Sequence, residues 1–183
     1  MTSTSVEAAF RAVPETMVAE ILEGELHTRG RPAPREGLAV SVLAGELHGP
    51  FRRGNGGPGG WVVVREPEIH LGLDRVVPDL VGWRRARMPD EIGTEEHYTH
   101  VPDWICEVLS IDTEANDRGK KMRIYRREGV GHVWLLNPRT RTLEVYRLEQ
   151  GRWILLETYE GATTVRAEPF DAFELDLSLL WEP

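Results

Sequence analysis

Two carboxylates stand inside apolar stretches of the sequence, and each could take part in chemistry. Asp79 lies within the apolar run 76–83, and Glu107 lies within the run 104–109. An ionised carboxylate in apolar surroundings is costly unless a metal ion, a cation or several hydrogen bonds compensate for its charge. Two such acids on converging strands can hold Mg²⁺ through their oxygens, and a nearby lysine can stabilise charge on a phosphate. Phosphodiester hydrolysis is the reaction class that needs this set.

Each acid also has a simpler explanation, which stays open at this point. Asp79 follows Pro78, and such pairs are common in turns and at strand ends. Glu107 could lie on the exposed face of an edge strand. Against this, the period of two in a strand places Glu107 on the same face as the apolar Ile105 and Leu109. A further alternative is a purely structural domain in which salt bridges compensate both acids.

The candidate lysine comes from a helix expected after the second acidic strand, with Asn116 as its N-cap and Gly129 at its C-terminal end. Lys120 and Lys121 are adjacent on this helix. Neighbouring helix residues point about 100° apart, so both lysines cannot face the sheet equally. Lys121 shares its face with Tyr125, but spacing alone does not choose between the two lysines.

The elements that must position these residues form a mixed pattern. Residues 17–27, with Gly24 at the bend, suggest a short strand pair or a strand with a bulge, and the apolar spacing over residues 36–47 predicts a helix. Further strands are expected at residues 61–65, 68–73, 76–83, 104–109, 132–136, 142–148, 153–159 and 163–166. The order predicts one α/β or α+β domain over residues 1–183, with residues 1–13 as a loose N-terminal arm.

Composition narrows the class of protein. The 183 residues carry a net charge of −8, which argues mildly against a general nucleic-acid coat protein. The longest apolar runs are too short to span a membrane, the N-terminus lacks a signal-peptide pattern, and the single cysteine, Cys106, falls in an apolar strand. We therefore expect a cytoplasmic protein without a membrane partner. Six of the 22 basic residues lie in one helix: Arg118, Lys120, Lys121, Arg123, Arg126 and Arg127. This helix and the basic loop with Arg84, Arg85 and Arg87 are expected to line a nucleic-acid approach.

An ordered series of motifs resembles the Uma family of putative restriction endonucleases, within the PD-(D/E)xK nuclease superfamily. The motifs are Val77-Pro78-Asp79-Leu80, Glu107-Val108-Leu109-Ser110, Asp117-(x3)-Lys121-(x3)-Tyr125, Gly129-Val130, Val133-Trp134 and Asn137-Pro138. The resemblance covers about residues 17–148. It implies a restriction-endonuclease-like fold, in which a central mixed β-sheet is flanked by helices.

The resemblance also implies a site and an activity. Asp79 and Glu107 would be the ligands of Mg²⁺ or Mn²⁺, and Lys121 would be the electrostatic partner, in an endonuclease that hydrolyses DNA. In the superfamily the lysine stands two residues after the second acid, where this chain has Leu109, and Lys121 matches the place to which many Uma-type sequences have moved it. Ile111 stands where the family usually has proline.

Two expectations follow from this reading. Cutting both strands of a duplex suits a two-fold symmetric protein, so we expect a homodimer. The alternative function is a nuclease fold that no longer cuts and instead binds nucleic acid or protein.

Overall fold

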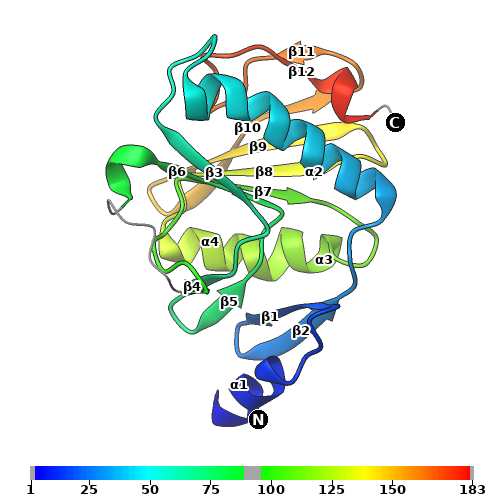
Figure 1. Ribbon diagram of the computed structural model, residues 1–183, viewed down its shortest axis with the longest axis vertical. Coiled ribbons are helices and arrows are strands. Elements are labelled where there is room, and N and C mark those ends of the chain that lie inside the picture. Colours follow the sequence, from blue (N-terminus) through cyan, green and yellow to red (C-terminus); the bar gives the residue numbers. More distant parts are fainter. Residues whose placement is uncertain (1–2, 89–95, 182–183) are drawn as a thin grey trace.

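The core of the protein is a six-stranded mixed sheet. The computed structural model describes residues 3–88 and 96–181. The sheet order is β10-β9-β8-β7-β6-β3; only β7 and β8 run parallel, and the other neighbours are antiparallel. The strands are β3 (Trp61–Arg65), β6 (Leu80–Arg84), β7 (Trp104–Val108), β8 (His132–Asn137), β9 (Thr142–Glu149) and β10 (Arg152–Glu160). Helix α2 (Pro34–Leu47) covers one face, and the helical segment between β7 and β8 covers the other (Figure 1). The expected mixed fold is confirmed.

The alternation of side chains along β7 separates two cores. Trp104, Cys106 and Val108 pack on the α2 side of the sheet. Ile105 and Leu109 pack on the opposite side. Glu107 lies between these two apolar residues in the alternation, so it belongs to the side that faces away from α2.

A second, antiparallel sheet has the order β2-β1-β5-β4. Its strands are β1 (Val18–Leu22), β2 (Glu25–Arg29), β4 (Ile69–Leu71) and β5 (Asp74–Val76). The expected strand pair over 17–27 is confirmed, and Gly24 takes the left-handed φ of 82° that the tight turn requires. In Figure 1 this sheet lies on the side of the central sheet away from α2, next to the crossover helices.

The apolar run 76–83 is not one strand, as its pattern predicted. β5 ends at Val76 and β6 begins at Leu80, so Asp79 lies immediately before β6 rather than in the middle of a strand. Pro78 explains the break, because it has no N–H for a strand ladder and restricts the residue before it. The chain therefore passes from the second sheet into the central sheet just before Asp79.

The connection between β7 and β8 is helical from Glu114 to Glu128. α3 (Glu114–Asn116) leads into a π-helical turn, η3 (Asp117–Lys121), and then into α4 (Met122–Glu128). The helix begins two residues before the expected N-cap, and Asn116 Nδ2 instead lies 3.2 Å from His27 Nδ1. The expected end is confirmed, since Gly129 has a φ of 83°. π-helical turns often occur at functional sites.

The two chain ends add to the fold. Residues Ser3–Arg11 of the segment expected as a loose arm form α1, which packs on β1 and β2. After β10, the chain forms β11 (Thr164–Val165), β12 (Leu175–Asp176) and a 3₁₀ turn, η4 (Leu177–Leu180). Phe170 from this region packs on Trp104 and Trp134 in the α2-side core. Two further short helical segments are the π-helical η1 (His48–Arg53) and the 3₁₀-helical η2 (Arg85–Arg87). Within the described residues, no helix is both long and apolar enough to cross a bilayer.

Candidate functional site

Asp79 and Glu107 lie side by side on the face of the central sheet that α2 does not cover. In the pairing of β6 with β7, Leu80 is opposite Cys106, so the next position along places Asp79 beside Glu107. Both side chains are buried, and both line a pocket of about 190 Å³. Asp79 Oδ2 accepts the Val108 N–H at 2.7 Å. The sheet register thus fixes two carboxylates at the wall of one pocket.

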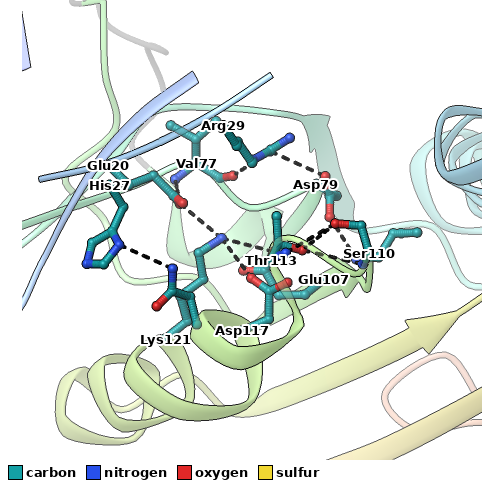
Figure 2. Close-up of polar contacts among 12 residues, drawn as sticks. Glu20, His27, Arg29, Val77, Asp79, Glu107, Ser110, Thr113, Asp117 and Lys121 are labelled. Atoms are coloured by element: carbon teal, nitrogen blue, oxygen red, sulfur yellow. Dashed lines mark hydrogen bonds and ion pairs between the residues drawn. The ribbon is translucent and has the colours of Figure 1, made fainter. Parts of the chain in front are cut away.

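Lys121 points into the same cluster. Its Nζ lies 2.9 Å from Glu20 Oε1, 3.2 Å from Asp117 Oδ1 and 3.3 Å from Glu107 Oε2 (Figure 2). Only 2% of the side chain is exposed. The π-helical turn presents Asp117 and Lys121, four residues apart, to the site together.

Lys120 points elsewhere. Its Nζ contacts Glu25 and lies 3.0 Å from His27 Nε2 near the protein surface. The structure therefore resolves the ambiguity that spacing left, because the lysine beside the strand acids is Lys121.

Sequence reasoning missed several neighbours of these three residues. Glu20, in β1, accepts the Val77 N–H at 2.8 Å with the same Oε1 that faces Lys121. The Tyr125 hydroxyl donates to Glu107 Oε1. Arg29 Nη2 lies 3.5 Å from Asp79 Oδ1 and 3.4 Å from the Val77 carbonyl oxygen. Glu20 carried the same signal as Glu107, since it is an acid flanked by apolar residues in a strand pattern.

The charges of this cluster do not balance. Glu20, Asp79, Glu107 and Asp117 are four buried acids, and the cations that contact them are Lys121 and Arg29. If all six groups were ionised, two negative charges would remain in excess. A buried excess charge is costly, and the groups respond through their pKa values.

The pKa values indicate how the groups of the cluster respond to this excess of negative charge. Burial raises the pKa of Asp79 to about 6, although Arg29 and Lys121 pull it down. Burial also raises the pKa of Glu107 well above its ordinary value, and Lys121 offsets only part of that effect. For Lys121, burial favours the neutral amine, but Glu107 and the other acids prevail and raise its pKa, so the ammonium stays charged. Burial raises the pKa of Tyr125, which keeps the hydroxyl protonated as a donor.

The residues present fit a hard divalent cation. The donors at the pocket are carboxylate oxygens, the ligand type that Mg²⁺ and Mn²⁺ prefer. Glu36 lines the same pocket, and its Oε2 is buried without a hydrogen-bond partner among the residues that the structure describes. Asp117 Oδ1 likewise has no hydrogen bond within the described part of the chain, and faces Lys121 only as an ion pair. One divalent ion would neutralise the two excess charges.

Most cationic side chains of the basic helix are paired with acidic side chains. Arg118 pairs with Glu144 at 2.6 Å, and Arg123 pairs with Glu23 at 2.7 Å. Besides Lys121, the cationic side chains that line the pocket are Arg29 and Arg31. The arginines that reach the pocket therefore come from the segment that begins at the end of β2, rather than from the helix.

Comparison with protein families decides the classification. A family model described as Uma2, putative restriction endonuclease, matches residues 8–178. The chain belongs to the Uma2 family. This confirms the resemblance drawn from the motifs, and the match extends beyond both ends of the region that carried it.

A solved structure shares the fold of this Uma2 chain. It is described as a putative nuclease belonging to DUF820 from Anabaena variabilis, and the two chains are 22% identical with a TM-score of 0.75. The match covers 94% of each chain. A search of curated proteins found no match. The neighbour supports the fold class, whereas the site rests on the geometry described above.

Proposed function

We propose that the protein is a metal-dependent endonuclease of the PD-(D/E)xK type, which hydrolyses DNA phosphodiester bonds. The observation that carries this proposal is the placement of Asp79 and Glu107 on adjacent strands at one pocket, with the Lys121 ammonium 3.3 Å from Glu107. Membership of the Uma2 family agrees with this reaction class.

In this proposal Asp79 and Glu107 hold Mg²⁺ or Mn²⁺. When bound, such an ion polarises a phosphate oxygen and lowers the pKa of its water, which supplies the nucleophile. The hydrogen bonds from Val108 N–H to Asp79 and from Tyr125 to Glu107 each leave one carboxylate oxygen of these acids facing other partners. The acids are thus oriented in advance, which reduces the cost of ordering them when an ion binds.

Lys121 stabilises negative charge on the phosphate. Glu20 and Asp117 hold its ammonium at the pocket wall, so the charge stays in place even when Glu107 engages another cation. A fixed ammonium in a buried site stabilises developing charge more strongly than one in water. Arg29 and Arg31, which line the same pocket, provide positive charge for an approaching phosphate.

One observation favours the alternative of a nuclease fold that binds without cutting. The three carboxylates within 3.3 Å of Lys121 already satisfy its charge, as in a structural salt-bridge cluster. Family membership does not decide the matter, because one fold serves several functions. Cleavage must be measured directly.

The test is cleavage of supercoiled plasmid, linear duplex and RNA by untagged protein, in Mg²⁺, Mn²⁺ or a chelator. We expect metal-dependent cutting of DNA by the wild type. Asp79→Asn and Glu107→Gln should abolish it, and the exposed Asp171→Asn should act like the wild type. Equal activity in all four proteins would indicate a contaminant and contradict the site. DNA and Mn²⁺ binding without cleavage would establish the alternative.

The oligomeric state is part of the same proposal. Cleavage of both strands suits a two-fold dimer, in which each copy cuts one strand. Sedimentation of the protein with and without duplex DNA measures this. A species that remains monomeric while it makes double-strand breaks would contradict the dimer but leave the site intact.

A further inference from the structure

A second cluster of metal-ligating side chains lies at the β4 edge of the four-stranded sheet. Residues 96–98 run beside β4, and Tyr98 forms a parallel bridge with Ile69. The Tyr98 N–H donates to the Glu68 carbonyl at 2.9 Å, and the His70 N–H donates to the Tyr98 carbonyl at 2.8 Å. These backbone hydrogen bonds fix which side chains share a face.

The register places three polar side chains on one face of the sheet at this edge and the side chains of Ile69 and Tyr98 on the other face. Ile69 is buried, and the Tyr98 ring stacks on Trp83 with centroids 4.9 Å apart. Because neighbouring strand residues point to opposite faces, the residues that flank this bridged pair point away from that core. These flanking residues are Glu68, His70 and His97.

The three side chains converge. His70 Nε2 lies 2.6 Å from Glu68 Oε1, and the His70 and His97 rings stack with centroids 3.6 Å apart. One ligand atom from each residue lies within 4.8 Å of the others, and all three residues are half-buried. We propose that Glu68, His70 and His97 bind a divalent transition-metal ion of the Zn²⁺ class. This site is separate from the carboxylate pocket at Asp79.

The donor set determines the class of ion. Two imidazoles and one carboxylate suit borderline ions such as Zn²⁺, whereas the all-oxygen pocket at Asp79 suits Mg²⁺ or Mn²⁺. Three protein ligands leave a fourth tetrahedral position for water. The ion would tie residues 96–98 to β4 through side chains as well as through the two backbone hydrogen bonds.

Binding requires rearrangement of the ligand side chains. Two ligand atoms on tetrahedral Zn²⁺ are about 3.3 Å apart, since each bond is about 2.0 Å long. The Glu68 oxygen and the His70 nitrogen must therefore move apart to admit the ion, which replaces the ring proton between them. An imidazole nitrogen binds a metal ion through a lone pair that lies in the plane of its ring. Because the two stacked rings lie in separate parallel planes, their lone pairs cannot both point at one ion, so at least one imidazole must turn out of the stack. Unstacking is thus a specific signature of binding at this site.

The experiment uses untagged full-length protein carrying Asp79→Asn and Glu107→Gln, which removes the other proposed site. Titration with Zn²⁺ against a chromophoric chelator should show one equivalent bound. His97→Ala and His70→Gln should each weaken Zn²⁺ binding by roughly 10- to 100-fold or more, since even the loss of an indirect partner has an effect of that size. His100→Ala is the matched control, because His100 is exposed and its side chain makes no hydrogen bond or ion pair with the residues that the structure describes. Its backbone carbonyl accepts from Trp83 Nε1.

Two further measurements separate this site from general histidine binding. Imidazole ¹⁵N shifts of His70 and His97, and of no other histidine, should change with the first equivalent of Zn²⁺. In the otherwise wild-type chain, His97→Ala should leave Mn²⁺ binding by calorimetry unchanged. Equal Zn²⁺ affinity in His97→Ala and the parent, or an equal loss in His100→Ala, would overturn the proposal. Either result would leave the nuclease proposal untouched.

Discussion

The two faces of β7 pack against different cores: an apolar core on the α2 side, and a core that combines apolar residues with a charged cluster on the other side. On the α2 side, the Trp104 ring meets Trp134 and Phe170 edge-on, with centroids 5.2 and 4.9 Å apart. On the other side, the same five-residue strand places Glu107 against the Lys121 ammonium and the Tyr125 hydroxyl. Adjacent residues of one strand thus enter an apolar core and a charged cluster.

This contrast indicates a division of roles. Close-packed aromatic rings stabilise the fold in a way that depends little on pH or metal ions. Buried acids gain little net stability from their partners. The free-energy cost of burying them changes with their protonation and with any bound cation. We therefore expect mutations on the α2 side to change stability alone. Mutations on the acidic side should change stability by an amount that depends on pH and on bound metal ions, and they should change activity directly.

The largest effect on stability should come from Trp134→Ala on the α2 side. This change removes the ring contacts with Trp104 and Phe170 and the hydrogen bond from Nε1 to the Glu168 carbonyl. Urea denaturation should show a loss of roughly 3–5 kcal/mol, the usual cost of truncating a buried tryptophan. The loss should be the same at pH 5 and pH 8, and with or without Mn²⁺. A marked dependence on pH or Mn²⁺ would contradict the proposed division of roles.

Lys121→Met should have the next largest effect on stability, and the size of this effect should depend on pH. The methionine keeps most of the stem but removes the charge that compensates Glu20, Glu107 and Asp117. At pH 8 the protein should lose roughly 3 kcal/mol, because buried acids are left without their cation. At pH 5 the loss should be smaller, since the acids can take up protons. Cleavage should fall roughly 10²-fold, measured where circular dichroism shows the variant folded.

Lys120→Met is the matched control for that experiment. Lys120 contacts Glu25, whose side chain is 69% exposed, so its ion pair contributes little. Its stability and cleavage should stay near wild-type values. If Lys120→Met were the inactive variant, the catalytic lysine would have been assigned wrongly.

Much of this site could be predicted because strand alternation is local. The apolar neighbours of Glu107 gave its strand and its face correctly, and the spacing of Gly129 gave the end of the helix. The strand break at Pro78 is also encoded locally, yet the apolar run around it concealed the break.

Other features depend on contacts that are distant in sequence. Glu20 reaches the cluster because β1 packs beside a helix about a hundred residues later, and no local pattern shows that pairing. The choice between Lys120 and Lys121 depends on how the π-helical turn rotates the helix, which spacing does not determine. The β4-edge cluster was missed for the same reason, since His97 is brought beside His70 by the pairing of two segments that are distant in sequence.

Asp79 should make the stability of the folded protein depend on pH. Its folded pKa of about 6 exceeds the ordinary value of 3.8, so its contribution to stability is fully present below pH 4 and is lost as pH rises through 6. The shift corresponds to on the order of 2–3 kcal/mol. Asp79→Asn lacks this ionisation and retains an oxygen that can accept the Val108 N–H. It should therefore gain stability relative to the metal-free wild type as pH rises from 4 to 7.5.

Thermal denaturation with and without Mn²⁺ measures that effect. At pH 7.5 Mn²⁺ should raise the melting temperature of the wild type, because the ion binds the ionised acids of the folded state. It should not stabilise Asp79→Asn, and its effect on the wild type should fade below pH 6 as protons compete for the ligands. An Asp79→Asn protein that is less stable than the wild type at every pH would make Asp79 a structural salt-bridge acid.

The smallest expected effect belongs to Glu20→Gln, which tests whether Glu20 positions Lys121. Glutamine keeps an oxygen that can accept the Val77 N–H and contact the ammonium, but it removes one negative charge from the cluster. The weakened hydrogen bond is worth about 1 kcal/mol, so cleavage should fall roughly fivefold. Mn²⁺ affinity should change little if Glu20 acts only through Lys121. Glu20→Leu should destabilise the protein further, because it leaves the Val77 N–H without its acceptor. In a Lys121→Met background, Glu20→Gln should have no additional effect on cleavage, since the group that it positions is gone. A full fivefold loss in that background would mean that Glu20 acts on the metal or the substrate directly.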